Sequence, residues 1–207
     1  MFQPTIDGRL RQEQADLNYS FIELVARAHR EQTDGTAGTV LGLRDEWAAS
    51  IARMRHRKRR EIAECTFALY GLHLHDTRFW CAVRPHHIPE DYALSETKCS
   101  AELEQRLVQF SLTALMHAWY VASSNEYGAR LLFGIPPSVV QRVATLPVTL
   151  IEKVARRSPA LLQARLAANR RFWPDLIACV DHGSKQQRFA AKLLGAQLIA
   201  ASSALVG

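Results

Sequence analysis

The chain has 207 residues, and 26 Lys and Arg against 20 Asp and Glu give it a formal net charge of +6 at pH 7. Its 48% hydrophobic and 22% charged residues are typical of a globular protein and exclude disordered, collagen-like and coiled-coil classes. Four cysteines without a Cys-x-x-Cys pair exclude a disulfide framework and a zinc ribbon. Pro4 and Gly8 interrupt a charged N-terminus, so we expect no signal peptide and a cytoplasmic protein.

The first half of the chain has the pattern of a helical domain. Residues 17–29 repeat apolar side chains at helical spacing, residues 33–38 predict a glycine-containing loop, and the helical pattern resumes from Gly42. An alternating run at 69–75 predicts a short strand. Residues 84–100 are polar, contain proline and lack a helical period, so they predict a linker.

The second half begins with a long helix, expected from Ala101 to about Ser124. Residues 107–125 carry no formal charge and approach the length of a membrane span, but Gln109 and His117 interrupt them. We therefore expect a buried helix and no membrane anchor.

Further helices are expected after this one. Gly134 predicts a helix end, and Pro136-Pro137 predicts the first turn of the next helix, where the missing N–H does no harm. The C-terminal run is apolar around most of its circumference, which indicates a helix that is either centrally buried or covered by a partner chain.

The two halves share the order of their elements. Aligned without gaps, residues 41–64 lie over residues 133–156, with their apolar positions matched. With one inserted residue, Phe79-Trp80 lies over Phe172-Trp173. This shared order predicts an internal duplication. The predicted boundaries are repeat one at 1–92, a linker at 93–99, repeat two at 100–183 and a C-terminal helix at 184–207.

A basic run, which holds six Lys and Arg within the eight residues 53–60, is the sharpest local feature. Such a density predicts a surface that neutralises DNA phosphates, because each contact releases condensed counterions. The counterpart in the second half, residues 145–152, lacks these cations. The alternatives are a solvated basic face and a site for an acidic protein. The candidate DNA contacts are Arg53, Arg55, Arg57, Lys58, Arg59 and Arg60.

Other motifs favour structural roles. Residues 134–156 have the pattern of a helix-turn-helix, but the first turn of its second helix has few side chains that read bases, which favours packing. No catalytic or nucleotide-binding motif is present, so we expect neither enzyme activity nor a cofactor. Irregular spacing speaks against a metal site in the one plausible cluster: His73, His75, Cys81, His86, His87 and Cys99.

The first half of the chain has a pattern made of residues 15–32, a glycine-containing loop, the Leu-Gly-Leu at 41–43 and two short helices that end at 62–64. This pattern resembles FlhD, a subunit of the flagellar master transcriptional activator. Residues 130–166 resemble the same family pattern. FlhD dimerises through intertwined helices, so the resemblance implies two tandem FlhD-like repeats that form a fused pseudo-dimer. The FlhD interface cysteine falls on Tyr70 and Leu162, so that disulfide is not implied.

The resemblance also implies a function. It predicts a DNA-binding subunit that recruits RNA polymerase together with an FlhC-like partner, in a mobile element where such activators switch on conjugative transfer genes. Two other classes stay open: a helical adaptor or anti-activator whose basic run binds an acidic protein, and a His/Cys metalloprotein.

Overall fold

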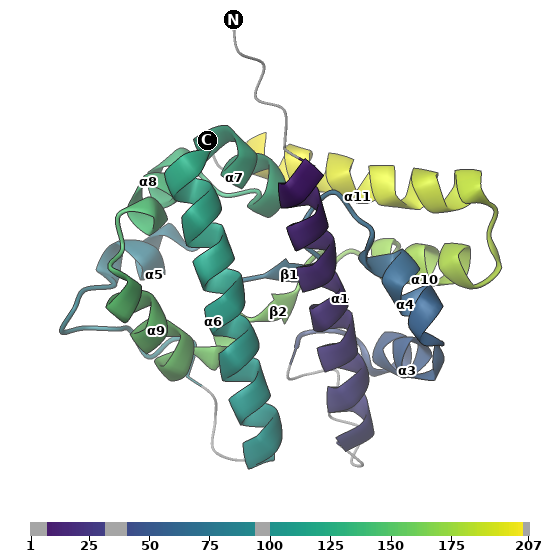
Figure 1. Cartoon of the computed structure of the whole chain (residues 1–207), viewed down its shortest axis with the longest axis horizontal. Helices are drawn as coiled ribbons and strands as arrows, with labels where there is room; N and C mark the ends of the chain where they lie inside the picture. The colour runs from purple at the N-terminus through teal and green to yellow at the C-terminus, as the bar shows by residue number, and fades with distance from the viewer. Residues whose placement is uncertain (1–7, 32–40, 94–99, 205–207) are drawn as a thin grey trace, which may run out of the picture. The chain divides into compact units, whose positions relative to one another are not determined.

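The computed structural model describes residues 8–31, 41–93 and 100–204. In this part of the chain ten α-helices and a 3₁₀ helix are joined by turns, and the described strands form a two-stranded sheet (Figure 1). The prediction of a mainly α fold with short β segments is confirmed. Among the described helices, none is long and apolar enough to cross a lipid bilayer.

The chain divides into two compact units, which we name after the long helix of each. The α1 unit comprises the described residues between 9 and 70 and between 163 and 198. The α6 unit comprises the described residues between 71 and 162, together with Gly8 and 199–204.

Five helices contribute to the α1 unit: α1 (Gly8–Glu31), α3 (Asp45–Arg53), α4 (His56–Ala63), α10 (Phe172–His182) and most of α11 (Lys185–Ala204). α10 packs on α3 and α4. Apolar side chains recur on one face of α1 at helical spacing, so Phe21, Ile22 and Val25 are buried there. Phe172 of α10 lies with its ring centroid 6.0 Å from that of Phe67 in the same core.

A buried asparagine fixes how α1 meets the chain that follows α4. Asn18 donates from Nδ2 to the carbonyl oxygens of Ala63 and Phe67 over 3.1 and 2.9 Å. Its Oδ1 accepts from the backbone N–H of Leu69 over 2.8 Å and from Nε2 of Gln14 over 3.1 Å. Every polar atom of the amide therefore has a partner, as a buried polar group requires.

The α6 unit is built around a long helix. Its elements are α5 (Thr77–Ala82), α6 (Ala101–Ser124), α7 (Glu126–Phe133), α8 (Pro137–Ala144), α9 (Val148–Arg157) and the 3₁₀ helix η1 (Pro159–Leu161). α6 packs on α7, α8, α9 and η1, and α5 packs on α8. The predicted limits of α6 are confirmed, and its uncharged stretch buries Leu107, Phe110 and Leu115, whereas Leu112 and Trp119 are half-buried.

The two strands are short: β1 (Tyr70–Gly71) pairs with β2 (Gln163–Ala164). The strand predicted at 69–75 is thus confirmed only at its start. The reason is the backbone of His73, whose φ of 45° turns the chain out of the extended conformation.

Matched local features accompany the two predicted repeats. α1 and α6 both have 24 residues. Gly42 and Gly134, which precede α3 and α8, have left-handed φ values of 67° and 60°. This conformation costs glycine little, which explains the residue type at both positions.

A second set of matched features follows each strand. His73 and Leu166 are the non-glycine residues with positive φ in the described chain, at 45° and 58°. Phe79-Trp80 and Phe172-Trp173 are both edge-to-face pairs, with centroids 5.3 and 5.5 Å apart. These matches favour the duplication, which stays a prediction.

The compact units are divided differently from the predicted repeats. The division falls at β1 and just before β2, whereas the predicted linker 93–99 lies almost wholly outside the described residues. α5 belongs to repeat one but packs on α8, and α10 belongs to repeat two but packs on α3 and α4. Each unit therefore combines helices of both predicted repeats, and the predicted boundaries remain a statement about sequence.

Candidate nucleic-acid interface

The basic run spans the end of α3, a tight turn and most of α4. Met54 and Arg55 form the turn in extended conformation, and the Met54 side chain is buried, which fixes the turn against the core. His56, Arg57 and Lys58 occupy the first turn of α4, which has no acidic residue. Cations there oppose the helix dipole, at a cost of up to about 1 kcal/mol each. The sequence at the N-terminus of α4 therefore does not favour helix stability.

Arg59 lies in the interior of the α1 unit and not on its surface. Its side chain is 7% exposed, and Nη1 lies 2.8 Å from Oε2 of Glu23 on α1. Nε donates to the carbonyl of Ile51 over 3.1 Å and Nη2 to that of Ala52 over 2.9 Å. Arg59 thus ties α4 to α1 and α3, and its expected exposure for a phosphate contact is wrong.

Lys58 is half-buried, and its partner also belongs to the α1 unit. Its Nζ pairs with the carboxylate of Asp181 and donates to the Asp181 carbonyl over 3.0 Å, which joins α4 to α10. The hydrogen bond from Lys58 holds the pKa of Asp181 below its ordinary value. Lys58 therefore acts as a link between helices.

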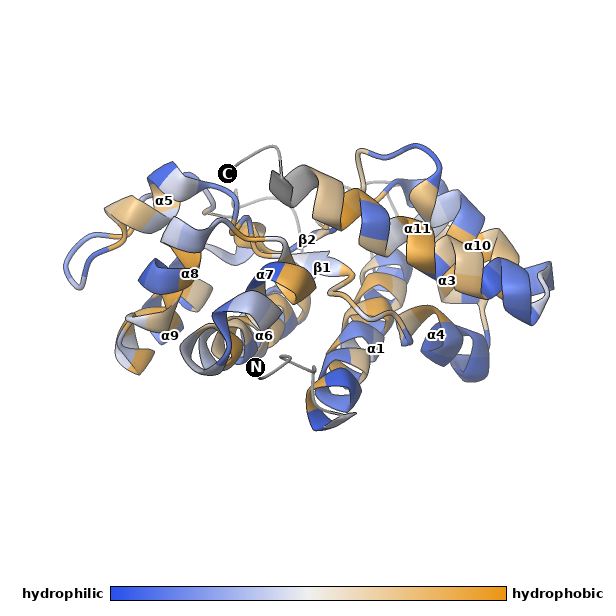
Figure 2. Cartoon of the chain, turned by 90° about the horizontal axis from the view of Figure 1, so that it is seen from above, coloured by the Kyte–Doolittle hydropathy of each residue, from blue (hydrophilic) through white to orange (hydrophobic). Residues whose placement is uncertain are grey.

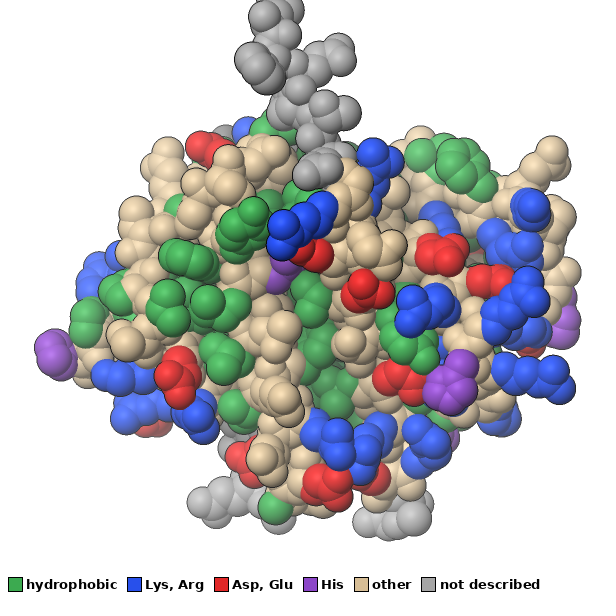
Figure 3. Space-filling model, viewed as in Figure 1, with side chains coloured by type: hydrophobic (Ala, Val, Ile, Leu, Met, Phe, Trp, Pro, Cys, Tyr) green, Lys and Arg blue, Asp and Glu red, His purple; other side chains and the backbone are tan. Residues whose placement is uncertain are grey.

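Four arginines of the run remain on the surface, and we call them the exposed basic surface: Arg53, Arg55, Arg57 and Arg60. The Arg57 side chain is 92% exposed, and its Nε lies 3.6 Å from Glu61 one turn later. Arg60 lies over the Tyr19 ring, 4.6 Å from its centroid. Neither Arg53 nor Arg55 has an acidic partner among the described residues. Figure 3 shows Lys and Arg side chains gathered over α4, with acidic side chains between them.

The acidic residues of α4 and its C-cap face α11. Glu61 lies 3.8 Å from Arg188, and Glu64 lies 3.8 Å from Lys192. Figure 2 shows α4 as hydrophilic along most of its length. The helix is thus held by ion pairs on its inner sides, and its outer side carries the exposed basic surface.

The matching helix of the second predicted repeat, α9, has a different surface. Thr149 stands where Arg57 stands in α4, and both side chains are exposed. Buried Leu150 and Ile151 stand where Lys58 and Arg59 stand. The predicted packing role of the helix pair α8–α9 agrees with this apolar inner face. The positions that match the four exposed arginines hold no cation in α8–α9.

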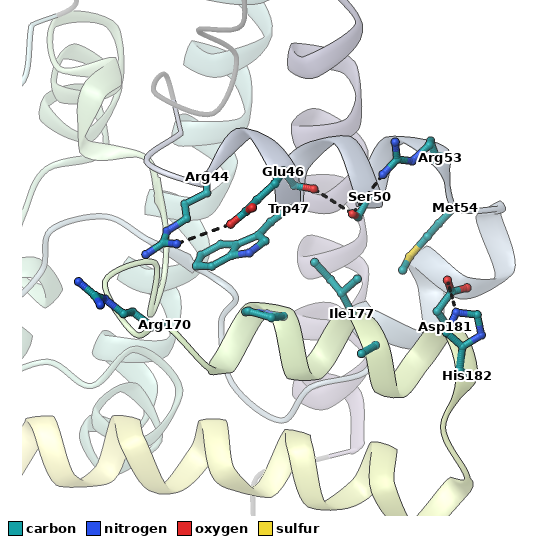
Figure 4. Close-up of a pocket in the computed structure, with 12 residues that line it drawn as sticks. Arg44, Glu46, Trp47, Ser50, Arg53, Met54, Arg170, Ile177, Asp181 and His182 are labelled. Atoms are coloured by element: carbon teal, nitrogen blue, oxygen red, sulfur yellow. Dashed lines mark hydrogen bonds and ion pairs between the residues drawn. The ribbon is translucent and has the colours of Figure 1, made fainter.

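A groove of about 600 Å³ lies beside the exposed basic surface, between α3 and α10 (Figure 4). Trp47, Met54 and Ile177 contribute apolar surface to it. Arg44 lies over the Trp47 ring at 4.8 Å from its centroid and 3.6 Å from Glu46. Much of the charge around the groove is thus already paired within the protein.

The described histidines between 73 and 87 include two that pack against each other. His73 and His75 lie with ring centroids 5.4 Å apart, and His73 stacks on Tyr92 at 4.6 Å. Within the described ranges, no group of three or more His, Cys, Asp or Glu side chains could hold a metal ion. Cys99 of the candidate cluster lies outside the described residues.

Sequence reasoning missed the partners of the inner cations, Glu23 and Asp181. A signal for Arg59 exists in the sequence, because Arg59, Ile62 and Ala63 share one helical face and the two apolar residues are buried. No comparable signal marks Asp181.

Comparison of the chain with protein-family models, with curated proteins and with solved structures gives no match. The resemblance to FlhD therefore rests on the residues of the chain alone.

Proposed function

We propose that this chain is one subunit of a heteromeric, DNA-binding transcriptional activator that acts with an FlhC-like partner. The observation that carries the proposal is the exposed basic surface on α3 and α4. Its four arginines lie on one helix pair, and the corresponding pair α8–α9 lacks them. The resemblance of both sequence halves to FlhD supplies the class of function.

The expected contacts are to phosphates. Exposed arginines such as Arg55 and Arg57 neutralise the DNA backbone, which positions a protein without reading bases. Four such contacts predict a slope of log affinity against log salt of about −3 to −4. Binding by this chain alone is therefore weak and depends little on DNA sequence.

Sequence selectivity then comes from the partner. The FlhC-like subunit reads bases, the assembled complex recruits RNA polymerase, and the regulated genes are transfer genes of a mobile element. This division of roles between the two subunits suits a chain in which Lys58 and Arg59 form ion pairs between its own helices.

Salt-dependent DNA binding tests the proposal. We would measure the affinity of the full chain for a short duplex of mixed sequence over a range of salt concentrations. Arg57→Thr introduces the residue found at the matching position of α9, and it should lower the magnitude of the slope by about 0.9. Arg55→Ala should do the same, with little dependence on DNA sequence.

Arg156 offers a matched control. It is exposed on α9 and pairs with Glu152 over 3.1 Å, as Arg57 pairs with Glu61 one turn away. Arg156→Thr should leave the slope unchanged. An equal effect of both variants would contradict a role for the exposed basic surface and indicate a response to net charge alone.

A second function, an adaptor or anti-activator without DNA contact, is favoured by the internal use of Lys58 and Arg59. It predicts that Arg57→Thr leaves the salt slope unchanged while it weakens binding to an acidic protein. The same titration therefore separates the two functions.

A further inference from the structure

The outer face of α11 is exposed and largely apolar. Phe189 is 69% exposed, the highest value among the exposed large apolar side chains of the described chain, and Leu193 and Leu194 are 46% and 39% exposed. Figure 2 shows apolar bands along this helix. The exposed side chains beside them are uncharged, namely Gln186, Ala190, Gln197 and Ala200, and the exposed cation of the helix is Lys185, one turn before Phe189.

The inner face of the same helix is already packed. Ala191, Gly195 and Ile199 recur every four residues and are buried. α11 thus has apolar residues on two opposite sides, and the chain covers only one of them. A helix face in contact with water ordinarily carries charged side chains along its length, so an apolar face whose exposed cation lies at one end marks a protein contact.

We infer that α11 pairs with α11 of a second copy of this chain, in antiparallel orientation, to form a symmetric dimer. Phe189, Leu193, Ala196 and Ala200 follow one another at steps of four, three and four residues. This spacing is that of the seam between two paired helices. These four residues are the seam of the proposed dimer.

Side-chain size selects the antiparallel register. When two copies of α11 overlap along their full length, the two-fold axis passes between Leu194 and Gly195. Phe189 of one copy then faces Ala200 of the other, and Leu193 faces Ala196. Each large side chain meets a small one, which allows close packing along a helix about 30 Å long.

The charges of α11 also favour this orientation. The helix has no acidic residue. Arg188 and Lys192 lie near Glu61 and Glu64, so the exposed cation of α11 is Lys185, at its N-terminus. A parallel pair would bring Lys185 beside Lys185. The antiparallel pair instead brings Lys185 of each helix beside the carbonyl end of the other, where the helix dipole is negative.

The experiment is sedimentation equilibrium of the full chain and of two neighbouring variants. The native chain should dimerise. Leu193→Glu places a carboxylate in the seam twice per dimer and should raise the dissociation constant by at least about 100-fold. Leu194→Glu is the matched control, because Leu194 is exposed but points about 100° away from Leu193 around the helix, and it should leave the dimer intact.

A size exchange tests the register. Phe189→Ala and Ala200→Phe should each weaken the dimer, because one leaves a gap and the other crowds two rings together. The double variant restores a large residue opposite a small one at both ends, and its dissociation constant should return to within about 10-fold of the native value. Circular dichroism of each variant checks that the chain remains folded.

Three results would overturn the inference. The first is a native chain that stays monomeric, which would assign the face of α11 to a different protein. The second is an equal effect of the Leu193 and Leu194 variants. The third is a double variant weaker than both single variants, which would place Phe189 and Ala200 apart.

Discussion

The Arg59 guanidinium and the Glu23 carboxylate lie 2.8 Å apart and join α4 to α1 inside the α1 unit. Two carbonyl oxygens, of Ile51 and Ala52, accept from the same side chain. A residue from the most basic stretch of the chain therefore supports packing. The surface that remains for a nucleic acid is smaller than the sequence predicts, and it is confined to one side of the α3–α4 pair.

Replacement of Arg59 by Ala should destabilise the fold. The change removes the ion-pair partner of Glu23, the donor to the Ala52 carbonyl and one of two donors to the Ile51 carbonyl, and such losses cost about 3 kcal/mol. Urea denaturation would measure the free energy of unfolding. Arg55→Ala is the control, because Arg55 is exposed, and its effect should stay within about 0.5 kcal/mol. A stable Arg59→Ala variant with weakened DNA binding would contradict the structural role.

The difference between Arg59 and Arg57 shows what a sequence reveals about this site. The density of charge identifies the basic run in the sequence. Helical spacing then distinguishes its buried side from its exposed side, because Arg59 shares a face with Ile62 and Ala63 whereas Arg57 does not. The partner of Lys58 is out of reach of such reasoning. Asp181 lies 123 residues further along the chain, and only the packing of α10 on α4 brings it close.

Asn18→Ala should cost more than an exposed substitution on the same helix. It leaves the carbonyl oxygen of Phe67 and the N–H of Leu69 unsatisfied in the interior and removes one of two donors to the Ala63 carbonyl, which predicts a loss of about 2–4 kcal/mol. Gln12→Ala removes an exposed amide from α1 and should be nearly neutral. Thermal and urea denaturation would compare them. Equal stability of the two variants would mean that water replaces the lost contacts.

The helices illustrate the same limit on sequence reasoning. α6 could be predicted from Ala101 to Ser124 because apolar spacing, an N-cap serine and the absence of proline all act locally. Which helices belong to each compact unit could not be predicted in this way. α5 packs on α8 and α10 packs on α3, and these contacts depend on where the chain goes after the short strands. Local pattern carries no information about that path.

Asp76 should contribute a pH-dependent part of the stability. Its carboxylate accepts from the N–H of Phe79 over 2.9 Å and from the hydroxyl of Tyr92 over 2.7 Å. The Phe79 hydrogen bond is the main cause that lowers the pKa of Asp76. A lowered folded pKa stabilises the fold above the ordinary Asp value of about 3.9, and this stabilisation is lost as the pH falls through the folded pKa.

Asp76→Asn isolates this effect. Asparagine keeps the cap, as Asn169 shows when its Oδ1 accepts from the N–H of Phe172 over 3.0 Å at the matching position. The stability difference between native chain and variant should therefore shrink as the pH falls below about 4. The exposed Asp91→Asn is the control. A difference that stays constant from neutral to acid pH would assign the effect of Asp76 to geometry alone.

Gly195→Ala should destabilise the contact between α11 and the core of the α1 unit. A Cβ at this position would lie 2.5 Å from ring atoms of both Phe67 and Phe172, closer than packed atoms can approach. Two buried aromatic rings cannot both yield, so α11 must shift, at a cost of about 1–3 kcal/mol. Gly8→Ala is the matched control, because nothing lies within 4 Å of its added Cβ.

Helix propensity predicts the same direction of change for both alanine variants, whereas packing predicts a loss for Gly195→Ala alone, which sharpens the test. Alanine favours a helix by about 1 kcal/mol over glycine, so an effect of propensity alone would stabilise both chains. A lowered unfolding midpoint for Gly195→Ala together with an unchanged or raised one for Gly8→Ala would establish that close packing, and not helix flexibility, selects glycine in α11. If Gly195→Ala also stabilises the chain, α11 does not approach Phe67 and Phe172 as closely as the structure places it. The outward direction of the Phe189 and Leu193 face, which is fixed by that approach, would then be in doubt as well.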